Sequence, residues 1–163
     1  NISKMWQFNF PNARPEVKSI LNGWNEWRQF EIELSQKPKS TLSAFKMKTK
    51  NVSSKADTLV ITAPFEYKKP QILSRLTTLN TKIKSLETFM NLEIIPQQKI
   101  AKLIPEINEE IRGLYNQWDE IVIKKAIPKE IGEELMLQAL DTTRNARPKQ
   151  MEEKMEISDK KIE

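Results

Sequence analysis

Apolar residues recur at alternating steps of three and four positions in two segments near the middle of the chain. The first series is Ile72, Leu76, Leu79, Ile83, Leu86 and Met90, and the second is Ile100, Ile104, Ile107, Ile111, Leu114, Trp118 and Ile121. Such heptad seams are typical of helices that bury one stripe against a partner. Because residues 91–96 form a short connection, the pattern predicts an antiparallel pair of helices over about 67–92 and 97–126. Pro105 interrupts the second seam, so we expect a lead-in turn and a main helix from that proline.

A third amphipathic helix is predicted over about 15–37. Pro15 stands at a first helical position, where proline is tolerated, and Pro38 follows the last one. The apolar face consists of Val17, Ile20, Leu21, Trp24, Trp27 and Leu34. Residues 1–14 carry three aromatic side chains without helical spacing. We interpret them as a lead-in, either the end of a preceding element or a strap over the core.

The other segments carry weaker patterns. Residues 38–65 show no sustained period, which predicts a long loop between the first and second helices. Helical spacing resumes over 129–163, after Pro128, and predicts extra C-terminal helices. We interpret these as an extension of the domain or as the start of a following repeat. Both ends of the sequence look like mid-chain segments, so we expect a piece of a longer protein.

Two of the predicted helices carry residues that resemble those of the spectrin repeat. The first helix of that family has a tryptophan followed by an acidic residue and a leucine, and "NEWRQFEIEL" is similar through Trp27, Glu31 and Leu34. The family's third helix combines apolar heptad steps with a tryptophan. "INEEIRGLYNQWDEI" is similar to it through Trp118 and the heptad residues around it.

The resemblance implies an all-α fold, with an antiparallel three-helix bundle over 15–126 in which Trp27 and Trp118 are core neighbours. The long 38–65 connection departs from the family's pattern, as do two prolines, so a divergent repeat of the nesprin, dystrophin or plakin kind fits best. The predicted structural core is Trp24, Trp27, Leu34, Ile72, Leu76, Leu79, Ile83, Leu86, Ile107, Ile111, Leu114, Trp118 and Ile121.

The amino-acid composition argues against catalysis and against metal or cofactor binding. The chain has no cysteine and no histidine, which removes the commonest metal ligands and the side chain best suited to acid–base catalysis near neutral pH. Its 3 glycines cannot build a phosphate-binding loop. We therefore expect no enzymatic activity, catalytic residue, metal site or cofactor. No apolar run approaches the length of about 18 residues that a membrane span requires, so we expect no membrane insertion by this segment.

Charge is distributed unevenly along the chain, although the formal net charge is only +5. Between 37 and 69 the only acidic residues are Asp57 and Glu66, whereas the lysines are Lys37, Lys39, Lys46, Lys48, Lys50, Lys55, Lys68 and Lys69. A lysine-rich stretch of this kind is either a solvated surface or a contact for an anionic partner.

The function that this organisation favours is a non-enzymatic cytoskeletal scaffold or linker, a helical repeat that spaces domains and docks a protein partner. The expected partners are a cytoskeletal or adaptor protein and neighbouring repeats of the same chain, and the candidate partner-binding residues are Phe45, Lys46, Lys48 and Lys50. The alternative is binding of nucleic acid or another polyanion through 37–69, which the scarcity of arginine there disfavours. We expect a cytoplasmic, cytoskeleton-associated location, with any membrane or nuclear-envelope attachment made by other parts of the parent protein.

Overall fold

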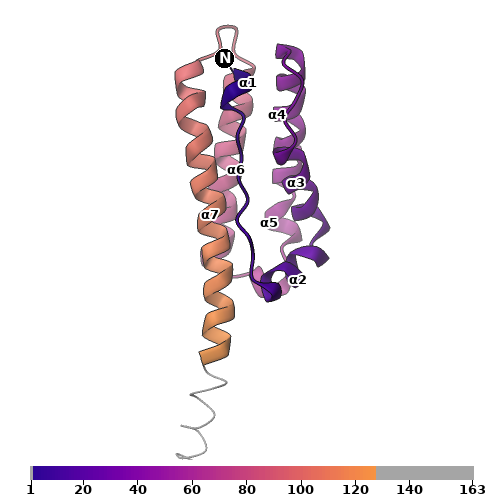
Figure 1. Ribbon diagram of the computed structural model, residues 1–163, viewed down its shortest axis with the longest axis vertical. Helices are drawn as coiled ribbons and strands as arrows, with labels where there is room; N and C mark the ends of the chain where they lie inside the picture. Colours follow the sequence, from indigo (N-terminus) through magenta and orange to yellow (C-terminus); the bar gives the residue numbers. More distant parts are fainter. Residues whose placement is uncertain (1, 128–163) are drawn as a thin grey trace, which may run out of the picture. The chain divides into compact units, whose positions relative to one another are not determined.

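The computed structural model describes residues 2–127, and within that range the secondary structure is helical, with no strand (Figure 1). The predicted all-α class is confirmed for these residues. The elements are α1 (Ile2–Met5), α2 (Pro15–Gly23), α3 (Asn25–Ser35), α4 (Leu42–Asp57), α5 (Leu59–Thr62), the 3-10 helix η1 (Phe65–Tyr67), α6 (Pro70–Met90) and α7 (Gln97–Ile127). The predicted extension over 129–163 lies outside the described residues.

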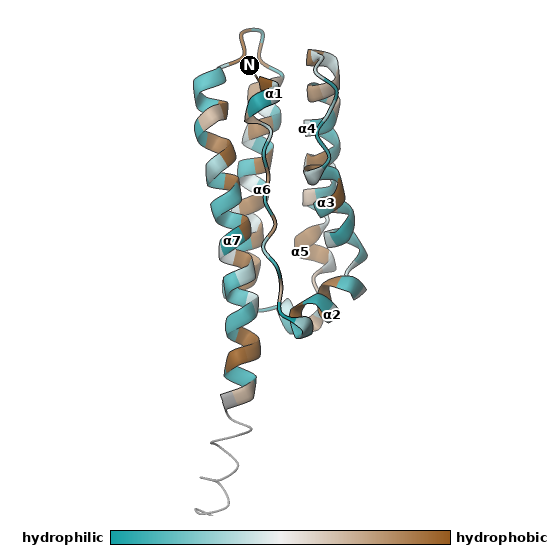
Figure 2. Cartoon of the chain, viewed as in Figure 1, coloured by the Kyte–Doolittle hydropathy of each residue, from teal (hydrophilic) through white to brown (hydrophobic). Residues whose placement is uncertain are grey.

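Residues 1–122 form one compact unit, and the packing described below belongs to it. Of the second unit, 123–163, the structure describes only 123–127, which continue α7. In the first unit α3 packs against α4, and α4 packs against α6. Apolar residues form stripes along the long helices rather than covering them completely (Figure 2). Every residue that the sequence predicted for the core is buried.

The helix predicted over 15–37 is divided in two at Trp24, so the prediction of one continuous helix is wrong. Gly23 ends α2, and Trp24 leaves the helical region with φ −101° and ψ 86°. The Trp24 carbonyl accepts a hydrogen bond from the Arg28 N–H and so begins α3. Glycine lowers helix stability by about 1 kcal/mol relative to alanine, which makes this position a natural break. The break turns the Trp24 indole into the core, where it donates to the Thr62 Oγ1 at 3.0 Å.

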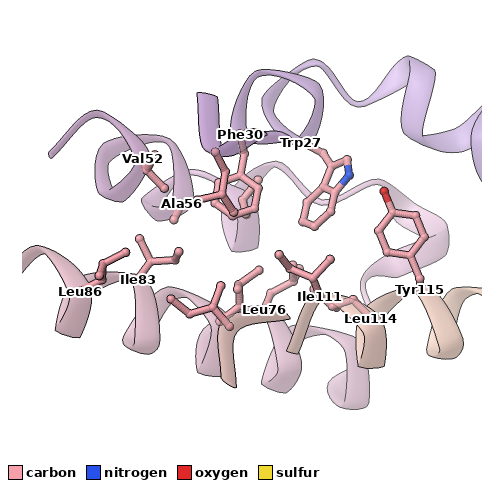
Figure 3. Packing of buried hydrophobic residues seen from close by; sticks show 14 of the residues in the cluster. Trp27, Phe30, Val52, Ala56, Leu76, Ile83, Leu86, Ile111, Leu114 and Tyr115 are labelled. Atoms are coloured by element: carbon pink, nitrogen blue, oxygen red, sulfur yellow. The ribbon is translucent and has the colours of Figure 1, made fainter. Parts of the chain in front are cut away.

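The long loop predicted over 38–65 is also wrong, because most of it forms α4, α5 and η1. Thr41 caps α4 by accepting a hydrogen bond from the Ala44 N–H. The buried stripe of this helix is Phe45, Thr49, Val52, Ser53 and Ala56. Three of these residues are small or polar, so the stripe is helical in spacing but weak in hydropathy. Figure 3 shows Val52 and Ala56 facing Ile83 and Leu86 of α6.

Helix α7 runs unbroken through Pro105, and the predicted lead-in turn is therefore wrong. A proline inside a helix costs about 3 kcal/mol because it removes one backbone hydrogen bond and crowds the preceding turn. Here the proline is on the exposed side, whereas Ile100, Ile104 and Ile107 on the opposite side are buried. Burial of each isoleucine contributes about 1.5–3 kcal/mol, so a continuous seam outweighs the proline.

The packing of α4 on the core can be tested by placing a larger side chain among its buried residues. Ala56 is 1% exposed, and replacing it with leucine should force the neighbouring side chains of the core apart. We expect Ala56→Leu to lower the free energy of unfolding by about 1–3 kcal/mol in urea denaturation. Ser54→Leu, on the exposed face of the same helix, is the matched control and should change it little. Equal stability of the two variants would contradict a packed α4.

Candidate docking groove

The four residues predicted to contact a partner are divided by α4 between its buried and its exposed faces. Phe45 is 3% exposed, and its ring lies edge-on to Trp6 at a centroid distance of 6.0 Å. It is therefore a core residue, and its assignment to a binding surface is wrong. Lys48 is half-buried, and its Nζ donates to both the Oε1 and the backbone carbonyl of Glu33, each at 3.0 Å. This lysine is occupied within the fold.

Lys46 and Lys50 line an open groove between the first half of α4 and the last turn of α6. The lining residues are Leu42, Ser43, Lys46, Met47, Lys50, Glu87 and Asn91, and the volume is about 810 Å³. We call this feature the α4–α6 groove. It follows from helical geometry, because residues 42, 43, 46, 47 and 50 are brought to one side of α4 by steps of three and four.

Two large apolar side chains in the α4–α6 groove are exposed, with Met47 at 58% and Leu42 at 49%. Neither lysine of the groove makes an ion pair with a described residue, whereas nearby lysines are paired. Lys84 lies 2.8 Å from the Asp57 carboxylate, and its hydrogen bond is the main reason that the pKa of Asp57 is lowered. The α4–α6 groove thus combines unpaired cations with exposed apolar surface, an arrangement suited to docking rather than to catalysis.

The second prominent feature is an aromatic cluster around Trp118, which is fully buried. Its ring stacks on Tyr67 at 5.0 Å and contacts Trp27 edge-on, also at 5.0 Å. Trp24 and Tyr115 complete its surroundings. Trp27 and Trp118 are therefore core neighbours, as the spectrin resemblance implied. Burial raises the pKa of Tyr115 to about 12, so the phenol is neutral in the physiological range. The cluster is a structural centre and leaves no exposed aromatic surface there.

No group of three or more histidine, cysteine, aspartate or glutamate residues within the described part of the chain could hold a metal ion. Within the same part, no helix is both long and apolar enough to cross a membrane. Comparisons of the chain with protein-family models, with curated proteins and with solved structures found no match. Function is therefore inferred from the residues of the fold itself.

Glu31 allows a pH-dependent test of burial beside the aromatic cluster. Burial raises the pKa of its carboxyl above the ordinary value, so the charged form is disfavoured in the folded state. The stabilising effect of protonation is complete below the unfolded-state pKa and is lost as the pH rises through the folded-state pKa. We expect Glu31→Gln to increase the free energy of unfolding at pH 7 and to lose this advantage near pH 4. Urea denaturation of the parent and the variant at both pH values measures this difference in the free energy of unfolding.

Glu16→Gln, a change at an exposed position on α2, is the control for that experiment. It should leave the pH dependence of the parent almost unchanged. If Glu31→Gln destabilises the protein at pH 7, the carboxylate contributes favourable contacts that outweigh the cost of its burial.

Proposed function

We propose that this chain is a non-enzymatic helical scaffold module that docks a protein partner in the α4–α6 groove. The observation that carries the proposal is that two lysines without a carboxylate partner in the described part of the chain share one groove with two exposed apolar side chains. Lys48, Lys82 and Lys84 each have a carboxylate within 3.0 Å. Lys46 and Lys50 have none among the described residues, and they flank the exposed Leu42 and Met47.

The partner that fits this surface is an acidic amphipathic helix. A groove between two helices accepts the apolar ridge of a third, and the anchors of such a ligand recur at steps of three and four. The two lysines lie on the α4 side, while Glu87 lies on the α6 side. An incoming helix would therefore place its acidic residues along α4, where they gain the two cations and avoid the carboxylate.

We further propose that α3, α6 and α7 correspond to the three helices of a divergent spectrin-like repeat, and that α4 is an added helix between the first two. The buried contact between Trp27 of α3 and Trp118 of α7 supports this correspondence. A cytoskeletal linker is the setting that such a repeat would suit, with the added helix supplying a docking surface that a plain three-helix spacer lacks.

Polyanion binding by 37–69 is the competing function, and the arrangement of the segment favours it less. Phe45 and Tyr67 are buried, so of the three aromatic rings in this segment one, that of Phe65, is exposed and open to stack on a base. Lys48 is paired with Glu33. In the α4–α6 groove the acidic Glu87 lies opposite Lys46 and Lys50, which opposes the binding of a polyanion there.

Binding of a designed probe tests the docking proposal. The probe is a fluorescein-labelled acidic helix about 20 residues long, with leucine on one face and glutamate beside it. Fluorescence anisotropy should show saturable binding to the parent chain. We expect the double change Lys46→Glu and Lys50→Glu to weaken binding at least tenfold, or by about 1.4 kcal/mol. Met47→Glu should weaken it as well, because it removes an apolar anchor.

The matched control replaces two other exposed lysines, Lys18 and Lys102, with glutamate. This variant has the same net charge as the double groove variant and should bind like the parent. Equal loss in both variants would indicate that net charge alone drives binding. Full displacement of the probe by single-stranded poly-dT, with a steep dependence on salt concentration, would support the polyanion alternative instead.

A further inference from the structure

The residues that precede α2 form an extended segment that lies between α3 and α7 (Figure 1). We call residues 6–14 the strap. Trp6 is 4% exposed, and Phe8 and Phe10 are half-buried, whereas Gln7 and Asn9 between them are exposed. This alternation has the period of two that an extended backbone imposes. Over residues 6–10 the strap therefore directs every second side chain, each of them aromatic, toward the core.

Asn108 of α7 holds the strap by its backbone. The Asn108 side-chain Oδ1 accepts a hydrogen bond from the Asn9 N–H at 3.0 Å, and its Nδ2 donates to the Gln7 carbonyl at 2.9 Å. A carboxamide that both accepts from and donates to one extended segment reproduces the pairing of a neighbouring β-strand. Such a contact recognises extended backbone regardless of the side chains at positions 7 and 9.

The aromatic side chains of the strap fill sites formed by the helices. The Trp6 indole donates to the Leu34 carbonyl at the end of α3, with a distance of 3.1 Å, and its ring contacts Phe45. Phe10 lies edge-on to Trp27 and Phe30 of α3. These contacts supply side-chain specificity, which the Asn108 contact does not.

Open space lies beside the strap at the point where Asn108 holds it. Two cavities, of about 340 and about 320 Å³, both include Asn9, Asn108 and Arg112 in their linings. Both lie on the α7 side of the strap, so the strap is not fully enclosed there. Toward its end the strap is joined to α7 by one weak ion pair, with 3.8 Å between Arg14 and Asp119.

We propose that the surface between α3 and α7 is a binding site for an extended peptide with aromatic residues at alternate positions, and that Trp6–Phe10 occupy it as a built-in ligand. The site is distinct from the α4–α6 groove, and the proposal does not depend on docking there. The chemistry of its ligand is that of the strap: backbone for Asn108, an indole for the Leu34 carbonyl, and a phenyl ring for Trp27 and Phe30. An incoming peptide competes with a tethered segment whose effective concentration is of millimolar order.

The test uses the full chain with a weakened strap and the strap sequence supplied as a peptide. The variant carries Trp6→Ala, Phe8→Ala and Phe10→Ala, and the probe is a fluorescein-labelled peptide of sequence ISKMWQFNFPNAR, residues 2–14. We expect the variant to bind this peptide at least tenfold more tightly than the parent, whose site is filled. A peptide with alanine at the same three positions should not bind. Adding Asn108→Ala to the variant should weaken binding about tenfold, whereas adding Asn116→Ala, an exposed position on α7, should not.

Circular dichroism of each variant shows whether it still folds, and so separates loss of binding from loss of structure. If the triple variant keeps its cooperative helical melting but does not bind the peptide, the proposal is wrong. If the triple variant unfolds, the single variant Phe8→Ala replaces it. Phe8 is only half-buried, and its aromatic contact is with Trp6, so its loss should be milder. In that milder variant the peptide in excess should accelerate hydrogen exchange at the Asn9 amide by displacing the strap. Unchanged exchange would show that the strap is an inseparable part of the core and would overturn the proposal.

Discussion

The contacts of Trp118 with the rings around it are the interaction on which the unit depends. Trp24, at the break between α2 and α3, and Trp27 of α3 both contact Trp118, and Tyr67 contacts it from η1. One side chain of α7 thus connects segments that are far apart in the sequence. Aromatic pairs of this kind contribute about 0.5–1.5 kcal/mol each beyond the burial of their area.

The sequence predicted α6 and α7 well because their buried stripes consist almost entirely of large apolar residues. Helix α4 was missed for the opposite reason. Its stripe includes Thr49, Ser53 and Ala56, whose helical spacing cannot be seen in hydropathy alone. Thr49 satisfies its hydroxyl by donating to the Lys46 carbonyl, so the side chain can be buried without a partner from another helix. The division at Trp24 follows the low helix propensity of Gly23, whereas the continuity of α7 through Pro105 depends on tertiary packing, which overrides local preference.

The candidate site could be predicted only in part. The sequence directed attention to the correct stretch of lysines, and two of its four candidate residues line the α4–α6 groove. It could not separate Lys48 from Lys46 and Lys50, since the separation depends on Glu33 of α3 lying beside one lysine and not the others. Phe45 was assigned to the surface because its segment was taken for a loop. The sequence allowed a strap over the core as one interpretation of residues 1–14. The hydrogen bonds from Asn108 that hold it could be seen only in the fold.

The two hydrogen bonds between Asn108 and the strap also affect the order in which parts of the chain fold. Asn108 and Gln7 are separated by 101 positions, one of the longest hydrogen-bonded separations in the described unit. During synthesis the strap leaves the ribosome before the helices on which it packs, and Asn108 emerges only after most of the unit. The two hydrogen bonds that hold the strap backbone therefore cannot form until Asn108 of α7 is in place. Local helix pairs such as α3 with α4 can close over short loops, whereas the strap contact has the larger entropic cost of a long one. The strap backbone, translated before the helices on which it packs, is thus among the last parts of the unit to be fixed in place.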